Sequence, residues 1–300
     1  MKFLENMWKH RAHVLMSLPV VLIMIFFAYV PMAGIVLAFK KFDYTLGIWK
    51  SPWVGLDNFK FLMQSKSTFI NMTRNTLLYY LLFTAVSTFL NITLAIAIDQ
   101  CVFKKVSKAM QSIMIIPAFI SYAAVQFVVY AYLNSSTGMI NEIFGLTTKW
   151  YMEAKYWPVI LTIVKIWSGT GYGSILYMSV LSGIDQEQYE AAQIDGATKW
   201  QQIKYITLPS LIPMVTIMLL LSVGGIMHSD TGLFYQVTRN SSMLSSTTQV
   251  IDSYVLNSIF KSSNFGFTAA TSLFQSVIGT ILMVISNLIV RKLEPENALF

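Results

Sequence analysis

Six long apolar stretches dominate the sequence and limit what the chain can fold into. About 20 apolar residues in a helix cross the roughly 30 Å hydrocarbon core of a bilayer. No alternating strand pattern of the kind found in membrane barrels accompanies these stretches. The sequence therefore predicts an all-α integral membrane protein with six transmembrane helices. The predicted spans are residues 14–39, 76–98, 112–133, 157–181, 206–226 and 267–290.

Composition supports a membrane location. Hydrophobic residues make up 55% of the chain and charged residues only 12%, whereas soluble domains carry about 25% charged residues. This excludes a cytosolic enzyme and a disordered tail. The single cysteine, Cys101, cannot form an internal disulfide, which excludes a secreted disulfide scaffold. The net charge of +7 fits loops that face anionic membrane lipid and does not indicate nucleic-acid binding.

An even number of spans places both termini on one side of the membrane. We predict an N-terminal segment 1–13, a transmembrane domain 14–290 and a C-terminal tail 291–300. Lys and Arg residues are equally numerous in the segments on the two sides, so the positive-inside rule does not choose the orientation.

Five prolines lie within the predicted spans. A proline inside a membrane helix frees a backbone carbonyl that neighbouring groups or water must satisfy. Plain kinks and functional bends both remain open as interpretations. The residues are Pro19, Pro31, Pro117, Pro209 and Pro213.

The loop 185–205, between the fourth and fifth predicted spans, is the most informative segment. Asp185 is the expected N-cap of a short helix, with Gln188 as its capping-box partner. Gly196 is expected to end this helix in the left-handed conformation, and a second short helix over 198–206 leads into the next span. The loop either docks on a partner protein or lies as an amphipathic segment on the lipid surface.

The letters of this loop resemble the EAA motif of the membrane subunits of binding-protein-dependent ABC importers. The matching residues are Glu190-Ala191-Ala192, Asp195-Gly196-Ala197 and Leu208-Pro209. The resemblance implies a type I permease fold, a cytoplasmic loop whose first helix docks on an ATPase subunit, and cytoplasmic termini in the plasma membrane. The residues expected to couple to the ATPase are Tyr189, Glu190, Ala191, Ala192, Asp195, Gly196 and Ala197.

Two further stretches, 27–62 and 232–255, are similar to permeases of carbohydrate importers, especially those for oligo- and polysaccharides. This implies a subunit that moves carbohydrate by alternating access. The implied partners are a second homologous permease in a heterodimer, two ATPase protomers and an extracellular solute-binding protein.

The sequence lacks enzyme motifs. It contains no G-x-x-x-x-G-K-[ST] phosphate loop, no H-E-x-x-H helix and no G-x-S-x-G elbow. We therefore expect no catalytic residue, metal site or cofactor in this chain, with ATP and Mg²⁺ bound by the partner ATPase.

Polar and aromatic residues in and beside the spans are candidates for a substrate pathway. Lys165 is costly at mid-bilayer, so it either lines a cavity, snorkels to the surface or pairs with a backbone carbonyl. Gly169, Gly171 and Gly173 either open the fourth span or let helices pack closely. The candidates are Asn91, Tyr122, Gln126, Lys165, Trp167, Tyr172, Tyr177, Asp230, Tyr235, Gln236 and Arg239.

Two other functions remain open at this point. The cargo of an importer could be something other than sugar, because the EAA motif is shared by importers of many substrates. Alternatively, the chain could be a membrane scaffold or sensor that recruits an ATPase and transports nothing. The scarcity of charge within the spans favours a neutral or weakly anionic cargo.

Overall fold

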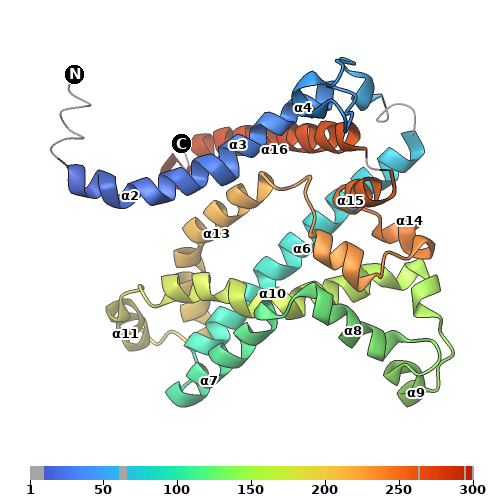
Figure 1. Cartoon of the computed structure of the whole chain (residues 1–300). Helices are drawn as coiled ribbons and strands as arrows, with labels where there is room; N and C mark the ends of the chain where they lie inside the picture. Colours follow the sequence, from blue (N-terminus) through green and yellow to red (C-terminus); the bar gives the residue numbers. More distant parts are fainter. Residues whose placement is uncertain (1–9, 61–65, 263, 294, 299–300) are drawn as a thin grey trace. The chain divides into compact units, whose positions relative to one another are not determined.

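The computed structural model describes residues 10–60, 66–262, 264–293 and 295–298. Within these residues the chain is almost entirely helical and has no β-strand (Figure 1). Parts of the predicted terminal segments, namely 1–9, 294 and 299–300, and residues 61–62 of the stretch 27–62 lie outside the described residues.

Five helices of the described part are long and apolar enough to cross a membrane, and a sixth span is formed if one bent pair counts as one. This confirms an all-α membrane fold. The five are Arg11–Phe39, Ser67–Asp99, Ala154–Leu181, Lys199–Val223 and Phe265–Lys292.

The chain divides into two compact units, one of residues 1–65 and 257–274 and the other of residues 66–256 and 275–300. In the first unit, α2 (Arg11–Met24) and α3 (Val30–Met32) belong to the apolar N-terminal helix, and α4 (Gly47–Lys50) follows it. The Asn58 amide donates to the carbonyls of Ala38 and Lys40 at 3.0 and 2.9 Å. Asn58 thereby fixes the turn after the first helix.

The second unit is built around two long helices, and α10 packs most extensively on α6 (Figure 1). Its core contains Trp157 and Leu161 of α10, both fully buried, with Leu233 and Val250 from the segment that follows α13. The helices of this unit are α6 (Lys66–Asp99), α7 (Lys104–Ile115), α8 (Tyr122–Leu133), α9 (Met139–Phe144), α10 (Trp157–Leu181), α11 (Gln186–Ile194), α12 (Lys199–Gln202), α13 (Leu208–Val223) and α14 (Ser245–Thr248). Two helices, α15 (Ile251–Ser262) and α16 (Phe265–Leu293), run through both units.

The predicted span 112–133 is not a single rod. The helix Lys104–Phe119 and the helix Tyr122–Leu133 meet at an angle of 97°. Ile120 and Ser121 between them have extended backbones, and Pro117 lies in the preceding tight turn. Two extended residues turn the chain far more sharply than a proline kink alone.

The predicted second short helix, 198–206, is also not separate. The chain is helical without a break from Lys199 to Val223, with a π-helical segment at Ile203–Thr207. Pro209 lacks the N–H that would bond to the Tyr205 carbonyl, and the wider π turn lies just where that bond is lost. The proline therefore changes the winding of the helix without ending it.

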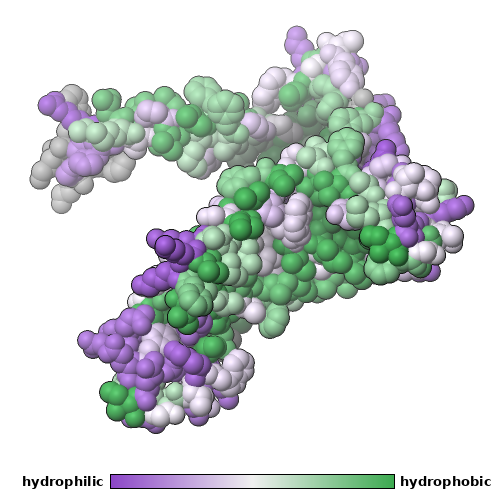
Figure 2. All heavy atoms as spheres, turned by 90° about the horizontal axis from the view of Figure 1, so that it is seen from below, coloured by the Kyte–Doolittle hydropathy of each residue, from purple (hydrophilic) through white to green (hydrophobic). Residues whose placement is uncertain are grey.

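Large apolar side chains cover much of the surface, as Figure 2 shows, with hydrophilic residues gathered in separate groups. Within Arg11–Met24 no residue is buried. Such a surface suits lipid or a membrane partner and would aggregate in water.

Candidate functional site

The loop 185–205 is shaped by local hydrogen bonds. The Asp185 carboxylate accepts a hydrogen bond from the Glu187 N–H at 3.0 Å, which confirms the predicted N-cap of α11. The predicted capping box with Gln188 is wrong, because the carboxylate bonds to the second N–H of the helix. A capping box is present instead at the start of α12, between Thr198 and Gln201. Each short helix therefore begins with its own cap.

Gly196 turns the chain between the two short helices. Its φ of +79° lies in the left-handed region, as the sequence predicted. The Gly196 N–H donates to the Gln193 carbonyl at 3.0 Å, and the Ala197 N–H donates to the Ala192 carbonyl at 2.8 Å. These two bonds form a Schellman motif, which satisfies the last carbonyls of α11.

The predicted coupling residues lie on an accessible surface. Glu190, Ala191 and Asp195 are exposed, whereas Ala192 and Ala197 are half-buried. The Tyr189 hydroxyl shares a 2.9 Å hydrogen bond with Thr207, which ties the loop to the helix that follows it. Tyr189 of α11 is thereby connected to Thr207, the residue directly before α13.

Two apolar residues of this surface were missed by sequence reasoning. Ile194, at the end of α11, is 87% exposed, and Trp200 of α12 is 71% exposed. Both lie in a loop that is otherwise rich in charged and amide side chains. An apolar residue in such a loop could have identified them from the sequence. Together they add apolar surface to a loop that is otherwise charged and polar.

A cavity of about 250 Å³, with a mainly apolar surface and several polar groups, lies between α6, α10 and α13. The predicted pathway residues Asn91, Lys165 and Tyr177 line it together. Its other polar lining groups are hydroxyls that sequence reasoning did not single out: Thr84, Ser87, Thr88 and Ser222. Ser222 shares a 2.8 Å hydrogen bond with Tyr80, which joins α13 to α6 across one side of the cavity.

Lys165 forms an ion pair with Asp230 of the segment between α13 and α14, at 3.0 Å between Nζ and Oδ2. The two side chains are 32% and 31% exposed, so neither is sealed from solvent. The Asp230 carboxylate also accepts a hydrogen bond from the Leu233 N–H at 3.4 Å. The structure therefore gives Lys165 a carboxylate partner, where the sequence had left a cavity, snorkelling or a backbone carbonyl as alternatives.

The glycines of α10 allow close packing. The helix is continuous through all three, so the run does not open it. A Cβ atom at Gly171 would lie 1.8 Å from the Met114 carbonyl oxygen, and one at Gly173 would lie 2.4 Å from the Asn91 amide nitrogen. Gly169 has open space around it. The close contacts thus belong to Gly171 and Gly173, and Gly169 takes no part.

The remaining predicted pathway residues do not line this cavity. Trp167 and Tyr172 are exposed on α10, at 44% and 62%, and Gln126 donates to the Ala123 carbonyl of its own helix. The Tyr122 hydroxyl shares a 3.1 Å hydrogen bond with Ser168.

Three further candidates follow Asp230 in the chain. Tyr235 and Gln236 are half-buried in the helical turn 232–237. Arg239 is exposed, with its guanidinium 4.1 Å from the centre of the Tyr130 ring. Arg239 therefore contacts an aromatic ring of α8 and lies apart from the cavity-lining set.

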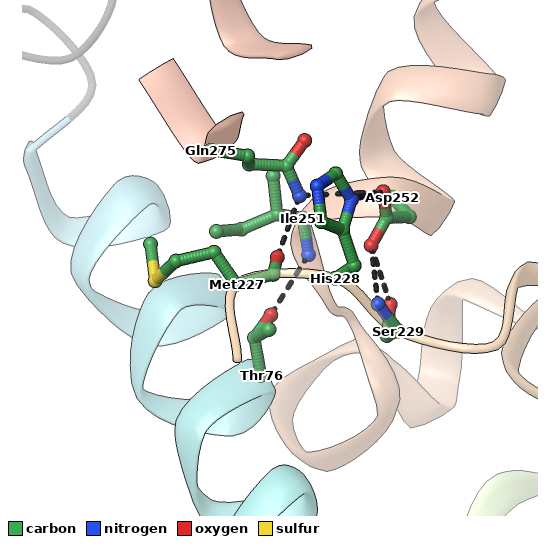
Figure 3. A network of polar contacts seen from close by, with 7 residues as sticks. All are labelled: Thr76, Met227, His228, Ser229, Ile251, Asp252 and Gln275. Atoms are coloured by element: carbon green, nitrogen blue, oxygen red, sulfur yellow. Dashed lines mark hydrogen bonds and ion pairs between the residues drawn. The ribbon is translucent and has the colours of Figure 1, made fainter. Parts of the chain in front are cut away.

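A second polar cluster, shown in Figure 3, holds the segment after α13 in place. Asp252 of α15 accepts hydrogen bonds from the Ser229 N–H at 2.6 Å and from the Ser229 hydroxyl at 2.9 Å. Gln275 of α16, 1% exposed, donates to Asp252 at 3.2 Å and to the Met227 carbonyl at 2.6 Å. A glutamine within an apolar span was the signal for this cluster.

His228 completes the cluster at its exposed edge, with Nδ1 3.5 Å from Asp252. The hydrogen bond to Asp252 raises the pKa of His228 above its ordinary value, although burial opposes the change. Burial alone would raise the pKa of Asp252, but hydrogen bonds from His228, Ser229 and Gln275 together lower it. The charged pair is therefore favoured in the folded chain.

Comparison with known families supplies an independent line of evidence. Residues 91–295 match the family described as binding-protein-dependent transport system inner membrane component. Protein LplB of Bacillus subtilis is 31% identical over 94% of this chain and 89% of its own length. The polygalacturonan/rhamnogalacturonan transport system permease protein YteP, also of Bacillus subtilis, is 29% identical over 94% of this chain and 88% of its own length.

Two solved structures are similar over almost the whole chain. One is a bacterial ABC transporter involved in the import of the acidic polysaccharide alginate, with a TM-score of 0.84 and 27% identity over 98% of this chain and 100% of that one. The other is a bacterial alginate ABC transporter in complex with an alginate pentasaccharide-bound periplasmic protein, with a TM-score of 0.86 and 27% identity over 98% of both chains.

Proposed function

The chain belongs to the family of inner membrane components of binding-protein-dependent transport systems, and we propose that it is one of two permease subunits of an ATP-driven oligosaccharide importer. The observation that carries the proposal is the loop 185–205, which is ordered by its own caps and exposes Ile194 and Trp200. A mere tether between two spans would need neither the caps nor the exposed apolar residues.

In this proposal α11 and α12 dock on a separate ATPase, which binds ATP and Mg²⁺ and carries out the hydrolysis. Glu190 and Asp195 pair with cationic groups of the ATPase, Ile194 enters an apolar pocket on it, and Ala191 and Ala192 allow its surface to come close. Closure of the ATPase would then move the base of α13 through the Tyr189–Thr207 bond. The loop, and with it both termini, lies on the cytoplasmic side of the plasma membrane.

The cavity lined by Asn91, Lys165 and Tyr177 forms part of the sugar pathway. Its hydroxyl and amide groups match the hydrogen-bonding groups of a carbohydrate. A second, homologous permease completes the pathway, and a solute-binding protein delivers the cargo from outside. The similarity to the YteP permease and to alginate importers supports a carbohydrate cargo.

Affinity purification of the tagged chain from its native membrane tests this function. We expect an ATPase, a second permease and a solute-binding protein to be recovered with it in fixed ratio by quantitative mass spectrometry. Recovery of the chain alone, or only as a homodimer, would contradict the proposal and favour a membrane scaffold.

A pair of charge-reversal variants locates the ATPase contact. Glu190→Lys should lose the ATPase and retain the second permease, because the substitution changes only the docking surface. Glu142→Lys makes the same change on another exposed short helix, α9, and should retain both partners.

A further inference from the structure

Lys165 lies between the cavity and the segment that joins α13 to α14, which carries Asp230. It lines the cavity of α6, α10 and α13, and its ammonium bonds to a carboxylate on a different element. An ammonium has three N–H donors, so the bond to Asp230 leaves donors for another oxygen. Lys165 thus contributes to the cavity wall, while its ammonium is held by a partly exposed carboxylate that does not line the cavity.

We propose that Lys165 is the residue that selects acidic cargo, and that the carboxylate of a uronic acid unit replaces Asp230 as its partner. This inference rests on the proposed function, since it assigns a substrate class to the same pathway. Lys165 is then a specificity-determining residue, and Asp230 holds its place until cargo arrives.

The exchange is chemically balanced because one carboxylate takes the place of another. Ion pairs that are partly exposed contribute little net stability, and both side chains here are about one-third exposed. A uronate can therefore compete with Asp230. A sugar hydroxyl is neutral and forms a weaker hydrogen bond with an ammonium, so a neutral sugar cannot displace the carboxylate as well.

The rest of the cavity suits the uncharged part of such a cargo. The hydroxyls of Thr84, Ser87 and Thr88 follow one stretch of α6, and Asn91 continues it. The lining set contains no other charged residue in the part of the chain that the structure describes. Lys165 is therefore the single group of this cavity able to distinguish a uronate from a neutral sugar.

Release of Lys165 would also loosen the segment after α13. The Asp230 side chain links that segment to α10 through the ion pair, while its second oxygen accepts from the Leu233 N–H. When the cargo carboxylate binds Lys165, the Lys165–Asp230 ion pair is lost and the hydrogen bond from the Leu233 N–H to Asp230 remains. Cargo entry thereby removes one contact between α10 and the segment that follows α13, while the bonds of Ser229 and Met227 to α15 and α16 stay in place.

Uptake by the complete complex tests the inference. The complex recovered with the tagged chain is reconstituted in liposomes, and ATP-driven uptake of oligogalacturonate and of oligoalginate is compared with uptake of their methyl esters. The ester has the same chain length and linkages without the charge. We expect the wild-type protein to prefer the acids, by about tenfold for one charged hydrogen bond against a neutral one.

Variants at the pair give the decisive contrast. Lys165→Gln should bring the ratio of acid uptake to ester uptake close to one, whereas Lys165→Arg should keep the preference for the acid. Asp230→Asn retains an oxygen for the Leu233 N–H and should lower the KM for the acids by several-fold without changing that for the esters. Lys155→Gln, which removes an exposed pair with Glu153, is the control and should change neither.

Three results would overturn the inference. If Lys165→Gln lowers acid and ester uptake equally, Lys165 acts only as a structural residue. If the wild type takes up acid and ester equally, the substrate class is wrong while the proposed function stands. If the wild-type complex takes up neither form although all three partners are recovered with it, the substrate class is wrong, whereas failure to recover the partners would contradict the proposed function.

Discussion

The loop 185–205 and the cavity around Lys165 are built in opposite ways. The hydrogen bonds of the two caps and of the Gly196 turn join residues two to five positions apart, as between Asp185 and Glu187 or between Ala192 and Ala197. The bonds that shape the cavity join distant residues, such as Lys165 and Asp230, 65 positions apart, and Tyr80 and Ser222, 142 apart.

This difference suits the two regions to different roles during a conformational change. A locally capped loop keeps its shape while the whole of it moves, so it is suited to follow a partner protein. A cavity whose walls are joined by long-range contacts changes shape whenever the helices shift. Under the proposed function, the loop would transmit motion from the ATPase and the cavity would change shape in response.

The largest predicted effect is the loss of ATP-driven uptake in variants of the loop 185–205. Glu190→Lys should abolish ATP-driven uptake while the melting temperature of the chain changes by less than about 2 °C, because an exposed residue contributes little to folding. Gly196→Pro should also abolish uptake, but through loss of the turn itself, since proline cannot adopt a φ of +79° and lacks the N–H that bonds to the Gln193 carbonyl. Uptake assays and thermal unfolding in detergent measure both quantities. Normal transport by both variants would contradict the coupling role.

The second prediction concerns packing behind the cavity. Gly171→Ala should destabilise the chain by about 1–3 kcal/mol, because its Cβ would meet the Met114 backbone oxygen. Gly169→Ala, two residues away with open space around it, should be neutral or stabilise by up to about 1 kcal/mol. Thermal unfolding of the two variants gives the comparison. Equal effects would mean that the helices do not pack as described.

A smaller effect is expected at the cluster of Figure 3. Asp252→Asn replaces a carboxylate that accepts from Ser229 and Gln275, and we expect a loss of about 1–2 kcal/mol. The matched control is Asp57→Asn, whose side chain is 57% exposed in a pair with Lys60, and it should melt as the wild type does. A loss as large in the control would show that burial of Asp252 is not the cause.

The smallest predicted effect is a pH dependence of stability. The pKa of His228 is raised from 6.5 in the folded chain, so its contribution is complete below that pH and is lost as the pH rises through the folded pKa. The pKa of Asp252 is lowered from 3.8, so its contribution is lost only in stronger acid.

Because the His228 side chain of this pair is 46% exposed, the expected fall in melting temperature is on the order of 1 °C between about pH 5.5 and about pH 9. His228→Gln should remove this difference from the melting curve. A profile identical to that of the wild type would mean that another group titrates.

The sequence was most informative where structure is local. Asp185 as an N-cap and Gly196 as a left-handed C-terminal residue were both predicted, because each conformation depends on one residue and its immediate neighbours. The capping box was assigned to Gln188, although the structure has one at Thr198 and Gln201. Both sites carry a suitable spacing, and which bond forms depends on small differences in side-chain geometry.

Long-range features could not be predicted in the same way. Lys165 was recognised as unusual in an apolar span, but its partner Asp230 lies on another element. The chain bends by 97° near Pro117, and the proline indicated a kink without its size. Gln275 lies in a predicted span, yet its contacts with Met227 and Asp252 depend on how α16 packs.

Cysteine cross-linking tests the central claim, that residues 185–205 dock on the ATPase, most directly. Ile194→Cys and Met243→Cys are placed separately in a Cys101→Ser background; both positions are well exposed, at 87% and 66%. The account predicts that Cys at 194 cross-links to the ATPase and is protected from a membrane-impermeant thiol reagent in intact cells, while Cys at 243 reacts with the reagent. Labelling of position 194 from outside, or its cross-linking to the solute-binding protein, would contradict the account.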